Sequence, residues 1–293
     1  MGKSSRFILG SKAALGLKSN LILISTVSLI ACGGGGGGSS DNGNNGGGPT
    51  PPNTFSVETT MVKGLVSGAN CELFEVDISG SKGASLALGT TVNGLADFGD
   101  SIEYQGTALI ECTGGTYTDE ATAANMIAPL LRAVVNLDGN TSTVVSPLTE
   151  IATQLAERAN NLNSALTTHN TSVANALGFG GDIIATIPTD LTSFQAGIND
   201  AGAYGTLLAM ISQLNANDAG SLSQLIDDLA ADLANGEFSN TSLSDMGTAL
   251  ADLTALDSPI ADNISPTIIA NICLLYTSPS PRDQRGSRMP SSA

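Results

Sequence analysis

The chain has 293 residues, enough for one or two domains, and a formal net charge of −16. Four of its 11 basic residues lie in the first twenty positions and three lie in the last twelve, so 11 − 4 − 3 = 4 remain between Gly33 and Ile272. That stretch holds 26 of the 27 acidic residues and carries 4 − 26 = −22. So acidic a surface repels phosphate backbones, which argues against nucleic acid as a partner.

Residues 1–31 have the organisation of an export signal. Basic residues without any acid precede the apolar run Leu21–Ile30, which is too short to span a bilayer as a helix. The run ends in the sequence LIAC, whose last residue is Cys32. Together these segments resemble the lipobox signal of a bacterial lipoprotein. The resemblance implies cleavage before Cys32 and attachment of lipid to it; the alternative is an ordinary secretory signal with an incidental cysteine.

Residues 32–54 are expected to be a lipid anchor followed by a flexible tether. The segment is dominated by Gly, Ser, Asn and Pro and has too few apolar side chains to form a core. Gly33 stands where an Asp would favour retention of such a lipoprotein in the inner membrane. The resemblance therefore implies the outer membrane, with the rest of the chain exposed to the periplasm or the cell surface.

Residues 55–145 are predicted to be a β-sandwich domain. Short runs rich in strand-forming residues alternate with Gly and Asn, which is typical of sandwiches. A turn is expected at Asn93–Gly94, and a hairpin is expected across Asp138–Gly139. The strands are expected in FSVETTMVKGLV, ANCELFEVDI, ASLALGTTVNGLADF, GTALIEC and LLRAVVNLDGNTSTVV.

Three of these segments carry a family resemblance. VKGLVSGANCELFEVD (Val62–Asp77), TTVNGLADF (Thr90–Phe98) and GTALIECTGGTYTDEAT (Gly106–Thr122) resemble the carboxypeptidase-regulatory-like, transthyretin-type sandwich. Members of that family are structural or binding modules without catalytic residues. The resemblance therefore implies a binding module rather than an enzyme.

Cys71 and Cys112 both fall on expected strands of this domain. Because an exported chain enters an oxidising compartment, we expect a disulfide between them. The alternative is two free, buried thiols.

Residues 146–272 are predicted to be helical. Ser146 is the expected N-cap and Pro147 the first helical residue of SPLTEIATQLAERA. SLSQLIDDLAADLANG has apolar residues at helical spacing, with Ser221 and Gln224 as a capping box and Gly236 as the terminator. The sequence thus predicts an α+β protein: an antiparallel β-sandwich followed by an all-α region, with the signal peptide, the tether and the C-terminal tail disordered.

Candidates for catalysis and metal binding are weak. His169, the only histidine of the chain, has no nucleophile motif beside it and is expected on a solvated helix face. The carboxylate pairs Asp119–Glu120 and Asp227–Asp228 could serve a glycosidase only at a separation that the sequence does not define. Asp41–Gly46 and Asn136–Thr143 are rich in oxygen ligands, but a tether and a turn explain them better than calcium does. No catalytic, cofactor or metal residue is predicted.

Residues 273–293 form a basic, Pro/Ser-rich tail. Codons that can encode Cys273–Asp283 reproduce the read-through of a transposase-type sequencing-library adapter, and codons for Ser287–Ala293 continue it in frame. The intervening Gln284–Gly286 matches the length of the adapter's index. We interpret the tail as adapter-derived and expect native sequence to end near Ile272 and the intact protein to continue.

The predicted function is that of a lipid-anchored outer-membrane protein acting as a non-enzymatic binding or adhesion module. Its expected partners are the membrane, through the lipid, and an envelope or extracellular ligand that the sequence does not identify. The alternative is the N-terminal accessory region of a secreted hydrolase whose catalytic domain would follow Ile272.

Overall fold

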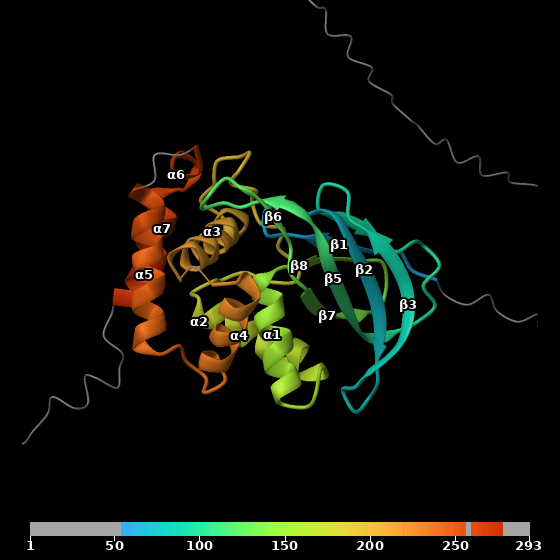
Figure 1. Cartoon of the computed structure of the whole chain (residues 1–293). Helices are drawn as coiled ribbons and strands as arrows, with labels where there is room; N and C mark the ends of the chain where they lie inside the picture. The colour runs from blue at the N-terminus through green and yellow to red at the C-terminus, as the bar shows by residue number, and fades with distance from the viewer. Residues whose placement is uncertain (1–53, 219, 256–258, 278–293) are drawn as a thin grey trace, which may run out of the picture. The chain divides into compact units, whose positions relative to one another are not determined.

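The computed structural model describes residues 54–218, 220–255 and 259–277. They fall within one compact unit, Pro51–Ala293 (Figure 1). The described residues form eight strands followed by seven α-helices, so the mixed α+β content predicted from the sequence is confirmed. Cys32, the tether up to residue 53 and the tail from residue 278 lie outside the described residues.

The larger sheet has five strands. Its centre is β2 (Ser67–Val76) paired antiparallel with β5 (Gly106–Thr118). The outer side of β2 pairs with β3 (Lys82–Thr90), and β5 pairs on its other side with β6 (Asn125–Ile127) and β7 (Leu131–Leu137), all antiparallel. This sheet contains most of the segments predicted to be strands.

The smaller sheet has three strands, in the order β4 (Leu95–Asp97), β1 (Val57–Met61) and β8 (Thr141–Val145). β4 follows the predicted turn at Asn93–Gly94, where φ is 50° and 84°, so that turn is confirmed. β1 and β8 run parallel. The expectation of a wholly antiparallel sandwich is therefore wrong for this pair.

The predicted hairpin across Asp138–Gly139 is also wrong. β7 pairs with β5 in the larger sheet, whereas β8 pairs with β1 in the smaller sheet. The tight turn is present, but the chain uses it to cross between sheets. Val134 and Val135 of β7 are neighbours of opposite orientation and both are buried, so β7 is covered on both faces although it pairs with β5 alone.

Helix α1 (Pro147–Arg158) begins as predicted. The Ser146 hydroxyl accepts hydrogen bonds from the backbone N–H groups of Leu148 and Thr149, and Pro147 occupies the first turn. The Thr149 hydroxyl accepts from the Ser146 N–H and completes a capping box. The helix packs against β7 (Figure 1).

The other helices include the predicted amphipathic one. Ser221 caps it through the Gln224 N–H, but the Gln224 side chain donates to Asp228, so only half of the predicted capping box forms. Gly236 has φ 97° and follows its last turn, as predicted. The remaining elements are η1 (Ala165–His169, a π-helical turn), α2 (Asn170–Ala176), α3 (Asp200–Asp218), α4 (Leu222–Leu233), α5 (Asn240–Ala255), α6 (Pro259–Asn263) and α7 (Pro266–Thr277).

Helix α7 passes through the predicted end of native sequence. Ile272 lies inside the helix and is buried, and the helix continues through Cys273–Thr277. These five residues are therefore helical, although the tail was expected to be disordered from Cys273 onward.

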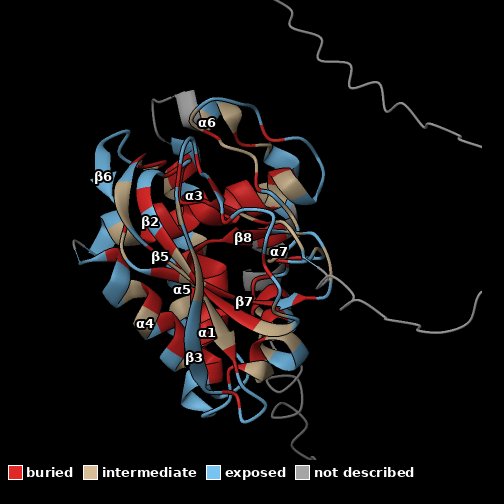
Figure 2. Cartoon of the chain, turned by 90° about the vertical axis from the view of Figure 1, so that its right-hand side faces the viewer, coloured by how far each residue is buried: buried red, intermediate tan, exposed pale blue. Residues whose placement is uncertain are grey.

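Strands and helices share one main hydrophobic core, which runs from Val57 in β1 to Ile272 in α7 (Figure 2). A second, smaller cluster covers the opposite face of the larger sheet, where Leu109 and Val134 meet Ala156 of α1 and Ala165 of η1. The part of the larger sheet around β5 and β7 is thus buried on both faces, whereas β3 has no buried residue and β6 is exposed. Within the described ranges, no helix is long and apolar enough to cross a membrane.

Candidate ligand-binding site

A fully buried lysine connects the strands to helix α3. Lys63 follows β1, and its Nζ lies 2.8 Å from Glu120 Oε2 and 3.4 Å from Asp119 Oδ2. Nζ also contacts Ser212 Oγ of α3, and the Ser212 hydroxyl donates to Glu120 Oε2 at 2.6 Å. The ring of Tyr117 lies 5.3 Å from Nζ. We call these five residues the Lys63 cluster.

The Lys63 cluster has the composition of a serine–lysine catalytic pair but not its chemistry. Such a pair needs a neutral lysine and a reachable hydroxyl. Burial lowers the pKa of Lys63, but attraction to Glu120 and Asp119 outweighs burial and holds that pKa above its ordinary value. Lys63 therefore remains an ammonium, and Ser212 is only 1% exposed. The cluster is a closed structural contact.

A second ion cluster joins β7 to α1. The Arg132 guanidinium donates to both carboxylate oxygens of Glu150 and to Glu157. Burial raises the pKa of Glu150, and the hydrogen bonds from Arg132 only partly oppose that effect. Gln154 extends the contact by donating to Asp227 of α4 at 2.6 Å. These groups fix the helices to the sheet.

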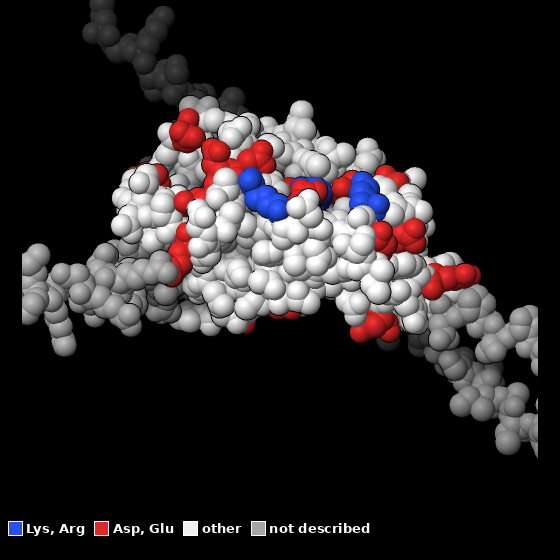
Figure 3. Space-filling view, turned by 90° about the horizontal axis from the view of Figure 1, so that it is seen from below, with Lys and Arg blue, Asp and Glu red and all other residues white. Residues whose placement is uncertain are grey.

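The two remaining basic residues of the described part are also engaged. Lys82 Nζ lies 2.6 Å from Glu111 Oε2, and Arg158 donates to the Asp227 carbonyl at 3.3 Å. In Figure 3, the blue surfaces have red surfaces as neighbours on the face shown. Every Lys and Arg side chain of the described residues therefore bonds to another part of the same chain. Because none is left to bind a ligand, we expect any ligand site to lie among uncharged side chains.

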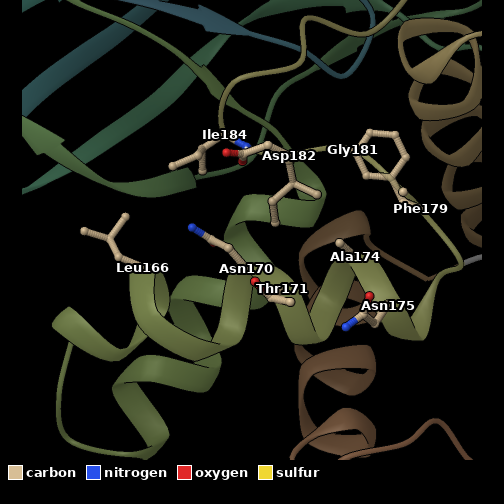
Figure 4. Close-up of a pocket in the computed structure, with 11 residues that line it drawn as sticks. Leu166, Asn170, Thr171, Ala174, Asn175, Phe179, Gly181, Asp182 and Ile184 are labelled. Carbon is tan, nitrogen blue, oxygen red and sulfur yellow. The ribbon is translucent and has the colours of Figure 1, made fainter.

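A pocket of about 400 Å³ lies between α2 and the loop after it (Figure 4). Val173 and Leu177 bury the inner side of α2 in the main core. Gly178, with φ 66°, ends the helix and reverses the chain. Residues 179–184 then run back past α2, and the space between helix and loop is the pocket.

The pocket has two walls: α2 provides neutral polar side chains, and the loop provides one carboxylate together with apolar side chains. Helix α2 contributes Asn170, Thr171 and Asn175, and the loop contributes Asp182. Asn170 is 9% exposed, and its side-chain amide makes no hydrogen bond to any residue that the structure describes. In Figure 4 this amide extends from α2 toward the loop segment that carries Asp182 and Ile184. The amide atoms are not among the fully buried unpaired atoms of the described residues, which are Gln213 Oε1 and Asn215 Oδ1, so the amide faces the pocket space and is available to a ligand or water.

The far end of the loop is held by aromatic packing and hydrogen bonds. The ring of Phe179 packs against that of Tyr204 in α3, with centroids 5.1 Å apart. The Tyr204 hydroxyl donates to the Ile183 carbonyl at 3.0 Å and so accepts from Ser146 Oγ at 2.6 Å. Burial raises the pKa of Tyr204, which therefore stays protonated. The pocket walls are thus preformed.

The predicted cysteine pair lies at the centre of the larger sheet. Cys71 of β2 and Cys112 of β5 are direct cross-strand partners, and the structure joins them by a disulfide with a Cα–Cα distance of 4.0 Å. Both are buried at the core face. The predicted lipid site, Cys32, lies outside the described residues.

The other predicted candidates are dispersed. Asp119 and Glu120 belong to the Lys63 cluster, and Asp227 and Asp228 bind Gln154 and Gln224 on different sides of α4. His169 ends η1 and is partly exposed, and partial burial alone lowers its pKa. The candidate calcium segment Asn136–Thr143 forms the crossing from β7 to β8, while Asp41–Gly46 is not described. Among the described residues, no three His, Cys, Asp or Glu side chains gather as metal ligands.

The sequence reasoning missed the pocket residues. His169 is expected on a solvated helix face, yet its neighbour Asn170 is buried. The glycine-containing segment 179–184, to which no role was assigned, forms one wall. The signal was a polar triplet, Asn170, Thr171 and Asn175, followed at once by a glycine-rich reversal. No protein-family model matches the chain, and no curated protein matches it.

Proposed function

We propose that the chain is a lipid-anchored protein of the bacterial outer membrane that binds a small ligand without transforming it. The observation that carries the binding role is the pocket, where the Asn170 side chain, 9% exposed, presents an amide that has no partner among the described residues. Ligand pockets commonly combine a few placed polar groups with apolar walls, as here. The acidic, basic and hydroxyl groups of the Lys63 cluster lie elsewhere and are closed.

The anchoring role rests on the sequence of residues 1–54. The lipobox-like LIAC run places Cys32 for lipid attachment, and the glycine-rich segment after it suits a tether. The two sheets are proposed to be a transthyretin-type module, on the resemblance of Val62–Asp77 and Thr90–Phe98. In this proposal the strands form the body that supports the helical pocket.

The anchor is tested by labelling growing cells with a fatty-acid analogue. The wild-type protein should carry the label and sediment with the outer membrane, and Cys32→Ser should lose both properties. Gly33→Ala keeps the cysteine and should label like the wild type. Label that persists on Cys32→Ser would refute lipid attachment at this residue.

Binding without turnover is tested on the purified full chain with a collection of small polar fragments. Ligand-observed NMR should detect fragments whose signal falls in Asn170→Leu, and these fragments should be recovered unchanged after prolonged incubation. Chemical conversion of a bound fragment by the wild type, but not by Asn170→Leu, would show an enzyme and contradict the proposal.

A further inference from the structure

The pocket's polar groups restrict the chemistry of the ligand. The amides of Asn170 and Asn175 and the hydroxyl of Thr171 can each donate and accept a hydrogen bond. Hydroxyl groups of a ligand have the same dual capacity, so several of them can be satisfied at once. A ligand with only donors or only acceptors would leave part of each amide unpaired at a cost in free energy.

Charge excludes an anionic ligand. No Lys or Arg lines the pocket, and Asp182 places a carboxylate in its wall. The segment Gly33–Ile272 carries −22, which repels anions further. A phosphate, sulfate or carboxylate would therefore lose its hydration without gaining a cation.

A cationic ligand also fits less well than a neutral one. Asp182 is the only carboxylate that lines the pocket, and its Oδ1 already accepts from the Ile184 N–H at 2.9 Å. The other polar side chains of the lining, Asn170, Thr171 and Asn175, are neutral, and one of the two carboxylate oxygens of Asp182 already has a partner. Asp182 Oδ2 remains able to accept from a ligand hydroxyl, which is a strong, charge-assisted bond.

Apolar groups complete the walls. Leu166 and Ile184 line the pocket beside Asn170, and the Phe179 ring lines it at the other end (Figure 4). Sugars present apolar C–H faces as well as hydroxyl edges, so one molecule can meet both kinds of wall. The volume of about 400 Å³ lies at the low end for ligand pockets and suits a molecule of one or two rings.

Resting on the binding role proposed above, we propose that this pocket takes a small, uncharged, polyhydroxylated ligand of the monosaccharide class. Asn170 forms the floor of the site and bonds two neighbouring hydroxyls, one as donor and one as acceptor. Thr171, Asn175 and Asp182 hold the outer hydroxyls near the opening.

The test uses the full chain in micelles of a detergent that lacks sugar and choline head groups. Saturation-transfer NMR is recorded with free glucose, galactose, rhamnose and N-acetylglucosamine, and with choline, spermidine and inorganic phosphate for comparison. At least one monosaccharide should receive saturation, and phosphate should receive none. Loss of the two Asn170 hydrogen bonds in Asn170→Leu should weaken that sugar's affinity at least about tenfold.

Two matched controls separate binding from folding. Asn240 is exposed at the start of α5, away from the pocket, so Asn240→Leu should bind the sugar like the wild type. Thr171→Val removes an exposed hydroxyl without a change of shape and should weaken binding severalfold, even if Asn170→Leu folds poorly. Thr168→Val, an equally exposed position outside the lining, should have no effect.

The outcomes distinguish the ligand class from the binding role. Sugar binding that is equal in the wild type, Asn170→Leu and Thr171→Val would overturn the assignment of the sugar to this pocket. Binding of choline or spermidine alone, with loss in both variants, would overturn the sugar class but keep the pocket as a binding site. If the folded wild type binds none of the probes, the sugar class is overturned, and the binding role fails if the fragment collection also yields nothing.

Discussion

The strand region and the helical region place their polar groups in opposite situations. In the Lys63 cluster, an ammonium, two carboxylates and a hydroxyl satisfy one another in a space without solvent. In the pocket, Asn170 is nearly as buried, but its amide has no partner among the described residues. Full pairing makes a polar group structural, whereas a preformed wall with an unpaired group leaves interaction energy for a ligand.

The largest effect is expected from removing the charge of Lys63, which pairs with both carboxylates of the Lys63 cluster. Lys63→Met should lower the free energy of unfolding by about 3–5 kcal/mol, because it leaves Asp119 and Glu120 buried without a cation. Urea unfolding followed by circular dichroism measures the effect. Lys82→Met is the matched control: its pair with Glu111 is partly exposed, so the loss should stay within about 1 kcal/mol.

The same cluster predicts a dependence on pH. Attraction to Lys63 and hydrogen bonds from Thr122 lower the pKa of Asp119, although burial opposes them. A carboxyl with a lowered folded-state pKa contributes stability above its ordinary pKa, and this contribution is lost as pH falls through the lowered value. The wild type should therefore lose stability more steeply than Asp119→Asn below about pH 4. Parallel loss in both proteins would contradict the role given to Asp119.

The disulfide between Cys71 and Cys112 is the second buried contact of the strand region that is predicted to stabilise the fold. Replacing both Cys71 and Cys112 with Ala should cost about 3–4 kcal/mol, because the bond closes a loop across a sequence separation of 41 residues. The pocket is formed by α2 and its loop, so the affinity for ligand should not change. Intact mass of the alkylated protein, with and without reductant, checks the bond: two thiols that alkylate without reduction would show that it is absent.

Local patterns allowed much of the fold to be predicted. The cap at Ser146, the stop at Gly236 and the turn at Asn93–Gly94 depend on neighbouring residues and were all recognised. The partner of β8 was not, because β1 lies more than eighty residues earlier and the nearby β7 looked like the natural partner. A strand's pairing is decided by burial of its faces, which no local turn signal contains.

The two sites were hidden for a similar reason. Lys63 and Ser212 are separated by 149 residues, so no motif spacing could join them. The available signal was a lysine among apolar residues, with Met61 and Val62 before it and Leu65 and Val66 after it. For the pocket, the local sequence of α2 is polar, and Asn170 faces loop residues 179–184, which the chain brings back past α2 only after the reversal at Gly178.

The smallest predicted effect on stability concerns Gly181, in the loop that forms one wall of the pocket. A Cβ at Gly181 would lie 2.6 Å from Phe179 Cζ and 3.2 Å from Asp200 Cβ, whereas a Cβ at the adjacent Gly180 would have nothing within 4 Å. Gly181→Ala must therefore displace the Phe179 ring, which packs on Tyr204, and should cost about 1–3 kcal/mol.

Gly180→Ala is the control for the same loop. Neither glycine has a positive φ, so alanine is allowed at both positions and its effect on the unfolded chain is the same. The difference between the two variants in urea unfolding thus isolates the packing of Phe179. Equal midpoints would mean that the loop yields freely, and the preformed wall on which the pocket depends would then have to be abandoned. A lower midpoint for Gly181→Ala alone would show that the wall is rigid, as binding through a fixed Asn170 amide requires.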